Sequence, residues 1–198
     1  MIKVKVKDYL FFILAFSMAL VVALSNYLVQ FPINYMGLKN FLTYGAFSYP
    51  IAFLITDLSN RRYGKNIAKK IVYLGFGLGV FLTLYFSTNY SDLISIRIAI
   101  GSGSAFLVAQ LIDINIFDKL RKKIWFVAPL ISSLIGSSID TFLFFSISFY
   151  GTGIDWIPLS FGDLLVKIFV ALVMLVPFRL LIYKFHEISN DKKKLVLS

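Results

Sequence analysis

Six apolar stretches, separated by short polar segments, make up most of this 198-residue chain. Each stretch is long enough to cross the hydrocarbon core of a bilayer, which takes a helix of about 20 residues. The pattern predicts an all-α membrane protein with six transmembrane helices. Because no linker is long or of low complexity, residues 1–198 are expected to form a single transmembrane domain. The expected spans lie within the uncharged run Tyr9–Leu38 and then at Asn40–Leu58, Ile67–Phe86, Arg97–Phe117, Ile124–Phe149 and Gly162–Tyr183.

Positive charge alternates between the segments that connect these stretches. Of the 20 Lys and Arg residues, 17 lie near the two ends of the chain, between the second and third stretches, or between the fourth and fifth. The exceptions are Lys39, Arg97 and Lys167. The positive-inside rule therefore predicts that both termini are cytoplasmic. The first apolar run is longer than the core of a usual signal peptide, so we expect it to stay as a helix.

Composition limits the chemistry further. Hydrophobic residues make up 59% of the chain and its mean hydropathy is +0.82, which exceeds what a soluble domain of this size can bury. The net charge of +10 indicates loops that face anionic membrane lipids, and no nucleic acid is expected as a partner.

Several kinds of catalytic and metal site are excluded by what the sequence lacks. There is no cysteine, and the single histidine, His186, lies in the C-terminal tail, so neither a thiolate site nor a His-based metal site can form. Nucleotide-binding and nucleophile motifs are missing as well. We therefore expect neither an enzyme nor a metal or cofactor. Any active transport has to use an ion gradient or a separate ATPase subunit.

The fourth stretch carries the most informative polar residues. Gly103, Phe106, Gln110, Asp113 and Phe117 are spaced by three and four, so they share one face of a helix. An amide beside a carboxylate can bind a planar heterocycle that has several N–H groups, and the flanking Phe rings could stack on it. The alternative is structural: Gln110 and Asp113 could hold helices together or bond to the basic loop that follows.

The fifth and sixth stretches contain ionisable residues deep in the apolar region. Asp140 follows a face of small residues that includes Ser133, Gly136 and Ser137, and it is too far from either loop to reach water. It is expected to pair with Lys167 or Arg97, or to act in binding or proton coupling.

The sixth stretch pairs an acid with a base one turn apart. Asp163 and Lys167 have the i,i+4 spacing of a helical ion pair. Lys167 could neutralise Asp163 or Asp140, or meet a ligand carbonyl.

Polar residues near the ends of two other stretches are weaker candidates. Asp57 and Arg61 are four residues apart at the end of the second stretch, where they could form an exposed salt bridge or a gate. Asn26 lies towards the outer end of the first helix and could line an entrance.

Motifs dispersed over nearly the whole chain resemble those of one known family. They are Ser25–Pro32; Thr43–Phe47, Pro50, Thr56–Leu58, Arg61 and Tyr63–Gly64; Gln110–Asp113, Phe117 and Leu120–Arg121; Trp125, Ala128–Pro129, Gly136, Asp140–Thr141 and Phe144–Phe145; Asp163, Lys167 and Pro177. On these residues the chain resembles the queuosine precursor transporter family, also described as vitamin uptake transporters. The resemblance implies import of 7-deazaguanine bases, the precursors of the tRNA nucleoside queuosine, across a bacterial inner membrane. Ser137 departs from the Asn that many relatives carry, which leaves the exact base open.

Taken together, the residues and the resemblance predict a multi-pass carrier whose substrate, a small 7-deazaguanine nucleobase, binds near the middle of the bilayer. Gln110, Asp113 and Asp140 would hold the base, and Lys167 would tune Asp140 or meet the base carbonyl. Phe106 and Phe117 would stack on the base, and Asn26 would line the entrance. Asp57, Arg61 and Asp163 would form gates or ion pairs.

Two points stay open at this stage. The chain could instead be the substrate-binding subunit of an energy-coupling-factor type importer, because small size and six helices fit both functions. The oligomeric state is also open, and a homo-oligomer is compatible with the sequence.

Overall fold

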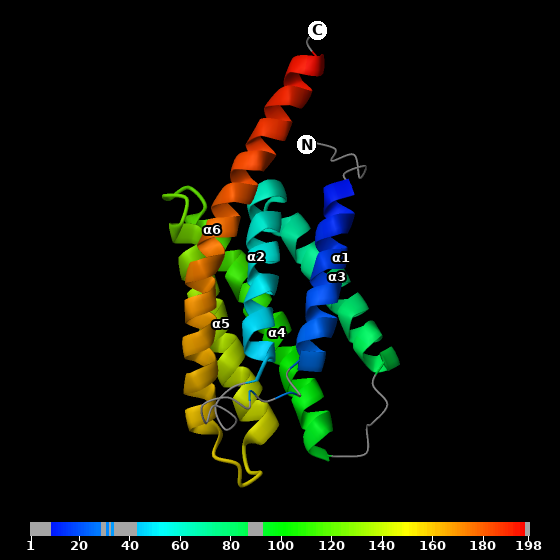
Figure 1. The fold of residues 1–198 in the computed structure, drawn as a ribbon, viewed down its shortest axis with the longest axis vertical. Coiled ribbons are helices and arrows are strands. Elements are labelled where there is room, and N and C mark those ends of the chain that lie inside the picture. The colour runs from blue at the N-terminus through cyan, green and yellow to red at the C-terminus, as the bar shows by residue number, and fades with distance from the viewer. Residues whose placement is uncertain (1–8, 29–30, 32, 34–42, 87–92, 197–198) are drawn as a thin grey trace.

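The computed structural model describes residues 9–28, 31, 33, 43–86 and 93–196. Within these ranges the chain is all-helical, as the apolar pattern predicts, and it contains six α-helices and no strand (Figure 1). Of the described helical segments, four are long and apolar enough to cross a membrane: Tyr9–Leu28, Ile96–Leu120, Val127–Phe149 and Trp156–Lys184. The helices are α1 (Tyr9–Leu28), α2 (Gly45–Tyr63), α3 (Lys65–Phe86), α4 (Leu93–Leu120), α5 (Val127–Phe149) and α6 (Trp156–Val196).

Helix boundaries depart from the expected spans mainly at the ends that carry charge. Helix α2 continues past Leu58 through Arg61 and Arg62 before it ends at Gly64, whose φ of 84° is in the left-handed region that glycine adopts readily. Helix α6 continues well beyond Tyr183 to Val196. At 1.5 Å per residue its 41 residues extend roughly 60 Å, about twice the thickness of the hydrocarbon core. Hydropathy marks the apolar part of a helix, and charged residues can prolong the same helix outside it.

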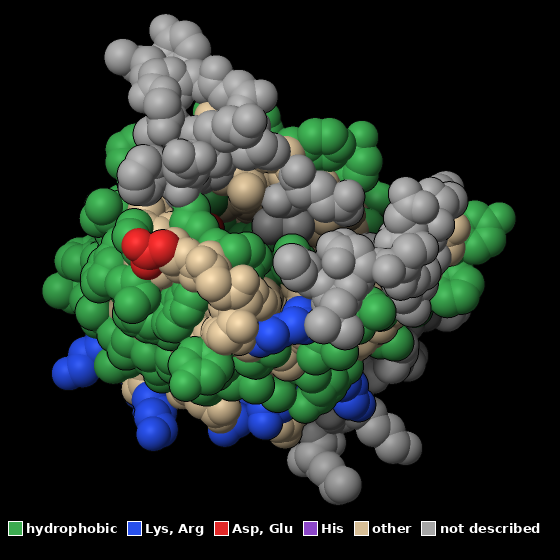
Figure 2. Space-filling model, turned by 90° about the horizontal axis from the view of Figure 1, so that it is seen from below, with side chains coloured by type: hydrophobic (Ala, Val, Ile, Leu, Met, Phe, Trp, Pro, Cys, Tyr) green, Lys and Arg blue, Asp and Glu red, His purple; other side chains and the backbone are tan. Residues whose placement is uncertain are grey.

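The distribution of side chains is the reverse of that in a soluble protein. Large apolar residues on the outer face of α6 are strongly exposed, for example Leu165 at 68% and Phe169 at 64%. In contrast, the charged side chains of Asp57, Asp140 and Lys167 are all below 5% exposed. Hydrophobic side chains also cover most of the described surface seen in Figure 2. Apolar outside and polar inside is the arrangement that a lipid environment favours.

Helix α2 occupies the centre of the bundle and contacts each of the other helices (Figure 1). On one side α1 and α3 pack closely because glycines of α3 face α1. A methyl group added at Gly79 would lie 2.7 Å from Cβ of Val22, so only glycine permits this approach. On the other side α2 packs against α4, α5 and α6. Polar residues of α2 are therefore enclosed by protein instead of facing lipid.

The described ends of the chain lie at the same end of the bundle as the α2–α3 turn and the α4–α5 loop (Figure 1). The two basic connections touch each other: Arg121 donates hydrogen bonds to the carbonyl oxygens of Asn60, at 2.5 Å, and Arg61, at 3.1 Å. The alternation of charge along the chain thus corresponds to one basic end of the molecule. The predicted basic residues Lys3, Lys5 and Lys7, and the exception Lys39, lie outside the described residues.

Candidate functional site

Two buried carboxyl groups meet where α2 packs on α4. The helices run in the same direction and are joined by two hydrogen bonds: the Thr56 hydroxyl donates to Oε1 of Gln110, and Nδ2 of Asn60 donates to the carbonyl of Ile114 at 2.9 Å. Asp57 and Asp113 lie between these bonds, so their side chains are neighbours at the contact between α2 and α4. Both residues are buried, at 2% and 0% exposure. We call these two residues, with Gln110 and the α5 serines described next, the Asp57–Asp113 cluster.

Helix α5 supplies hydroxyl groups to this cluster. Ser132 Oγ donates to Oδ1 of Asp57 at 3.3 Å, and Ser133 Oγ donates to Oδ2 at 3.2 Å. One turn further along α5, Gly136 lets the helix come close to its neighbours. A methyl group there would lie 2.6 Å from Cε1 of Phe53 and 3.4 Å from Cβ of Asp113. The face of small residues on α5 is thus what brings hydroxyl donors to the carboxyl pair.

Several polar atoms in this cluster are buried without a partner. Both oxygens of Asp113, Nε2 of Gln110 and Oγ of Ser137 accept or donate no hydrogen bond among the described residues. Each residue is at most 1% exposed. A buried polar group without a hydrogen bond costs about 1–3 kcal/mol, so native structures keep few of them. Together these atoms offer two acceptors, one amide donor and one hydroxyl, which suits a ligand with N–H groups and a carbonyl.

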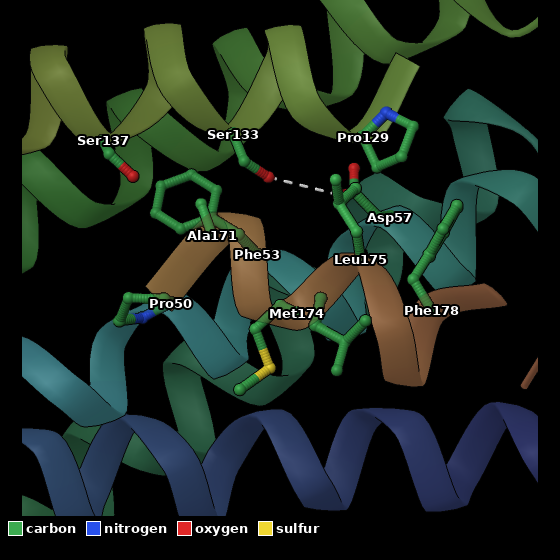
Figure 3. Close-up of a pocket in the computed structure, with 11 residues that line it drawn as sticks. Pro50, Phe53, Asp57, Pro129, Ser133, Ser137, Ala171, Met174, Leu175 and Phe178 are labelled. Atoms are coloured by element: carbon green, nitrogen blue, oxygen red, sulfur yellow. Dashed lines mark hydrogen bonds between the residues drawn. The ribbon is translucent and has the colours of Figure 1, made fainter. Parts of the chain in front are cut away.

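A small cavity adjoins the cluster, between α2, α5 and α6. Figure 3 shows Ser133 and Ser137 of α5 on one side, Asp57 and Phe53 of α2 behind, and α6 opposite. The cavity has room for about one water molecule and none for a heterocycle. The residues that line it are Pro50, Phe53, Leu54, Asp57, Pro129, Ser133, Ser137, Ala171, Met174, Leu175 and Phe178.

A second polar cluster surrounds Lys167 on α6. The Lys167 ammonium lies 2.9 Å from Oδ2 of Asp140 and 2.6 Å from Oδ2 of Asp163. It also donates to Oγ1 of Thr141 at 3.1 Å and lies 5.6 Å from the centre of the Tyr49 ring. The Thr141 hydroxyl in turn donates to Asp163 at 2.7 Å. We call these residues the Lys167 cluster. One ammonium serves two carboxylates, so the ionised cluster carries net negative charge.

The Lys167 cluster borders a second small cavity. Tyr49 links this cavity to the first helix, because its hydroxyl donates to Oδ1 of Asn26 at 3.0 Å. Along α5, Ser133 of the first cavity and Asp140 of the second are seven residues apart, or about 10 Å at 1.5 Å per residue. Since α2 runs towards the basic end from Tyr49 to Asp57, the Asp57–Asp113 cluster is the one nearer that end.

The structure brings together only part of the predicted site. Gln110 and Asp113 share a face, and the pairing of Lys167 with Asp163 and Asp140 is confirmed. Asp140, however, belongs to a different cluster from Gln110 and Asp113. This separates the three predicted base contacts, because Asp140 lies on α5 beside α6 whereas the other two lie on α4 beside α2.

The aromatic and gate residues also have unexpected neighbours. Phe106 stacks on Phe76 at 5.7 Å between ring centres and lies in an apolar cluster with α1 and α3, whereas Phe117 meets Phe178 edge-on at 6.2 Å. Neither lines one of the two cavities.

An ion pair between Asp57 and Arg61 does not form. The Asp57 carboxylate is buried and accepts hydrogen bonds from the α5 serines, whereas Arg61 donates to the carbonyl of Arg121 at 2.6 Å. Among the residues that sequence reasoning missed, Tyr49 is spaced by eight from Asp57 on one face of α2, and Ser132 adjoins the predicted Ser133.

This α-helical bundle has an apolar outer surface and buries several acidic side chains, some of them paired and some not. These features are typical of membrane transport proteins. Comparison with known proteins agrees. A family model described as "Putative vitamin uptake transporter" matches residues 43–182. The chain belongs to this vitamin uptake transporter family. No solved structure matches.

Two curated relatives match over most of their length. One, from Haemophilus influenzae, is named "Probable queuosine precursor transporter" and is 35% identical over 193 residues, which cover 83% of this chain and 82% of the relative. The other, from Escherichia coli, is named "Queuosine precursor transporter" and is 30% identical over 177 residues, which cover 80% of this chain and 79% of the relative.

Proposed function

We propose that this protein is a secondary transporter that imports queuosine precursors, which are 7-deazaguanine bases, across the bacterial inner membrane. The observation that carries the proposal is the set of buried, unpaired polar atoms on Asp113, Gln110 and Ser137, of which Ser137 lines a cavity between membrane helices. The names of the relatives from H. influenzae and E. coli support the substrate class. Six membrane spans with both termini in the cytoplasm are part of the proposal, supported by the single basic end of the molecule.

The chemistry of a guanine-like base fits the Asp57–Asp113 cluster. Adjacent N–H groups on the base can donate to the Asp113 carboxylate, and Nε2 of Gln110 can donate to the base carbonyl. Asp140 and Lys167 then form a second contact point, about 10 Å further along α5, on the path from the outer side. Asn26 would mark the entrance through its bond to Tyr49.

The packing supports a closed conformation between two open ones. Both cavities are too narrow for the base, so binding requires α6 to move away from α2 and α5, where Met174, Leu175 and Phe178 now cover the first cavity. Asp163 with Lys167 would close the outer side. Arg61, bonded to the Arg121 carbonyl, and Asp57 beside it would close the cytoplasmic side.

The function is tested in a bacterial strain that lacks its own precursor synthesis and its own transporter. Cells are given a 7-deazaguanine base, and queuosine in tRNA is measured. Wild type is expected to restore queuosine, whereas Gln110→Ala and Asp140→Asn are expected to restore it poorly at limiting base. The matched control is Asp118→Asn, which removes an acid that pairs with Arg121 near the surface. Equal rescue by all variants would refute the site, and no rescue by wild type would refute the function.

Purified protein in liposomes separates a carrier from a binding subunit. A secondary transporter moves labelled base across the vesicle membrane with no ATPase present. Tight binding without flux would instead indicate a subunit that needs an ATPase partner.

A further inference from the structure

We propose that the Asp57–Asp113 carboxyl pair holds one proton in the closed conformation and couples base uptake to the proton gradient. The inference rests on the proposed transport function and adds its source of energy. It starts from two buried acidic side chains, Asp57 of α2 and Asp113 of α4, which the α2–α4 hydrogen bonds bring side by side inside the bundle.

The groups that face the pair leave its negative charge uncompensated. Helix α2 contributes Asp57 itself, α4 contributes Asp113 and the Gln110 amide, and α5 contributes only serine hydroxyls. Helix α6 presents apolar side chains to the adjoining cavity. The salt bridges between described residues involve other acids, and the nearby Arg61 is directed to the loop carbonyl of Arg121.

Elementary electrostatics then requires a proton on the pair. Two adjacent carboxylates in a medium of low dielectric constant repel each other, and each has lost its hydration. A single proton turns this repulsion into a hydrogen bond from one carboxyl group to the other, and the proton belongs to the pair as a unit.

The Lys167 cluster provides the internal contrast. It also contains two acids, Asp140 and Asp163, but a permanent cation lies within 2.9 Å of both. In that cluster the ammonium already offsets one of the two negative charges, as a single proton would do for Asp57 and Asp113. Proton binding is therefore assigned to Asp57 and Asp113 and not to the acids on the outer side.

Coupling follows from the closed packing. Closing α5 and α6 over two ionised carboxylates is disfavoured, so closure requires a proton on the pair. Protons bind when the pair is open to the outer side, where proton activity is higher, and leave when it is open to the cytoplasm. Because the base and the proton travel in the same closed state, the proton gradient drives the base inward.

The test uses the full chain in liposomes with a radiolabelled 7-deazaguanine base that carries no charge. Potassium and valinomycin hold the membrane potential at zero. With one coupled proton, an inside-alkaline gradient of about one pH unit can drive up to about tenfold accumulation in wild type. Asp57→Asn is expected to lose this accumulation. Asp57→Glu, which keeps the proton-binding group, and the surface variant Asp118→Asn should both accumulate the base.

The outcomes separate the two proposals. Exchange by wild type without any response to the gradient would overturn coupling and leave the transport function intact, whereas no exchange by wild type would refute transport itself. Accumulation by Asp57→Asn equal to that of wild type would also overturn the assignment.

A spectroscopic measurement covers the case in which Asp57→Asn is inactive. Infrared difference spectra of wild type should contain the deuterium-sensitive carbonyl stretch of a buried carboxylic acid. The same band should be absent from Asp113→Asn and retained in Asp118→Asn. Absence of the band from wild type would contradict the shared proton.

Discussion

Lys167 is the residue whose removal should do most damage to the fold. Its side chain is 3% exposed, and its ammonium lies 2.9 Å from Asp140 and 2.6 Å from Asp163. Lys167→Met keeps a similar apolar stem but leaves two acids without their cation, with Thr141 as the remaining nearby donor. Removing one member of a buried ion pair costs about 3–5 kcal/mol, because the other member stays buried and uncompensated. For a chain of this length that loss lowers the melting temperature by roughly 10 °C.

The measurement is thermal unfolding of the purified protein in a mild detergent. Lys184→Met on the same helix is the matched control, because Lys184 is exposed and forms no described salt bridge. A second variant checks the cause. Adding Asp140→Asn to Lys167→Met removes one of the two stranded acids, so the double variant should be more stable than Lys167→Met alone. Equal melting temperatures for Lys167→Met and Lys184→Met would refute the account of this cluster.

Two further predictions concern packing and the end of α5. Gly136→Ala should destabilise the protein by about 1–3 kcal/mol, because its methyl group would lie 2.6 Å from the Phe53 ring. In the control Gly77→Ala, the methyl group meets nothing within 4 Å, so this variant should be neutral or stabilising. Comparable unfolding curves for the two variants would contradict this prediction. Arg97→Met should cost about 0.5–1.5 kcal/mol, because the guanidinium donates to the carbonyl of Tyr150 at 2.7 Å in an exposed hydrogen bond. Faster amide exchange at the end of α5 would locate the loss, and unchanged exchange there would count against it.

Relations within one helix were predictable from the sequence, and relations between helices were not. Spacing alone put Gln110 and Asp113 on one face and paired Asp163 with Lys167, because a helix repeats every 3.6 residues. The same spacing put Phe106 and Phe117 on the face of Gln110, but it could not show that their rings pack against Phe76 and Phe178.

The meeting of Asp57 with Asp113 depends on the way α2 and α4 pack. Thr56 and Asn60 set this register by bonding to Gln110 and Ile114 across the interface. Nothing in the local sequence around Asp57 identifies its partner, and the basic residues that follow it favoured a salt bridge to Arg61. Contacts of this kind join residues more than fifty positions apart, so they appear only when the helices are assembled.

The central claim is that the buried acid at Asp113 exists to hold the base, and equilibrium binding tests it most directly. Radiolabelled 7-deazaguanine base is titrated onto purified wild type, Asp113→Asn and Asp118→Asn, with each variant first shown to unfold at a similar temperature. Losing a hydrogen bond to a charged group costs about 1.5–3 kcal/mol, so Asp113→Asn should bind the base roughly 10- to 100-fold more weakly, with Asp118→Asn unchanged. Equal affinity of wild type and Asp113→Asn would contradict the claim.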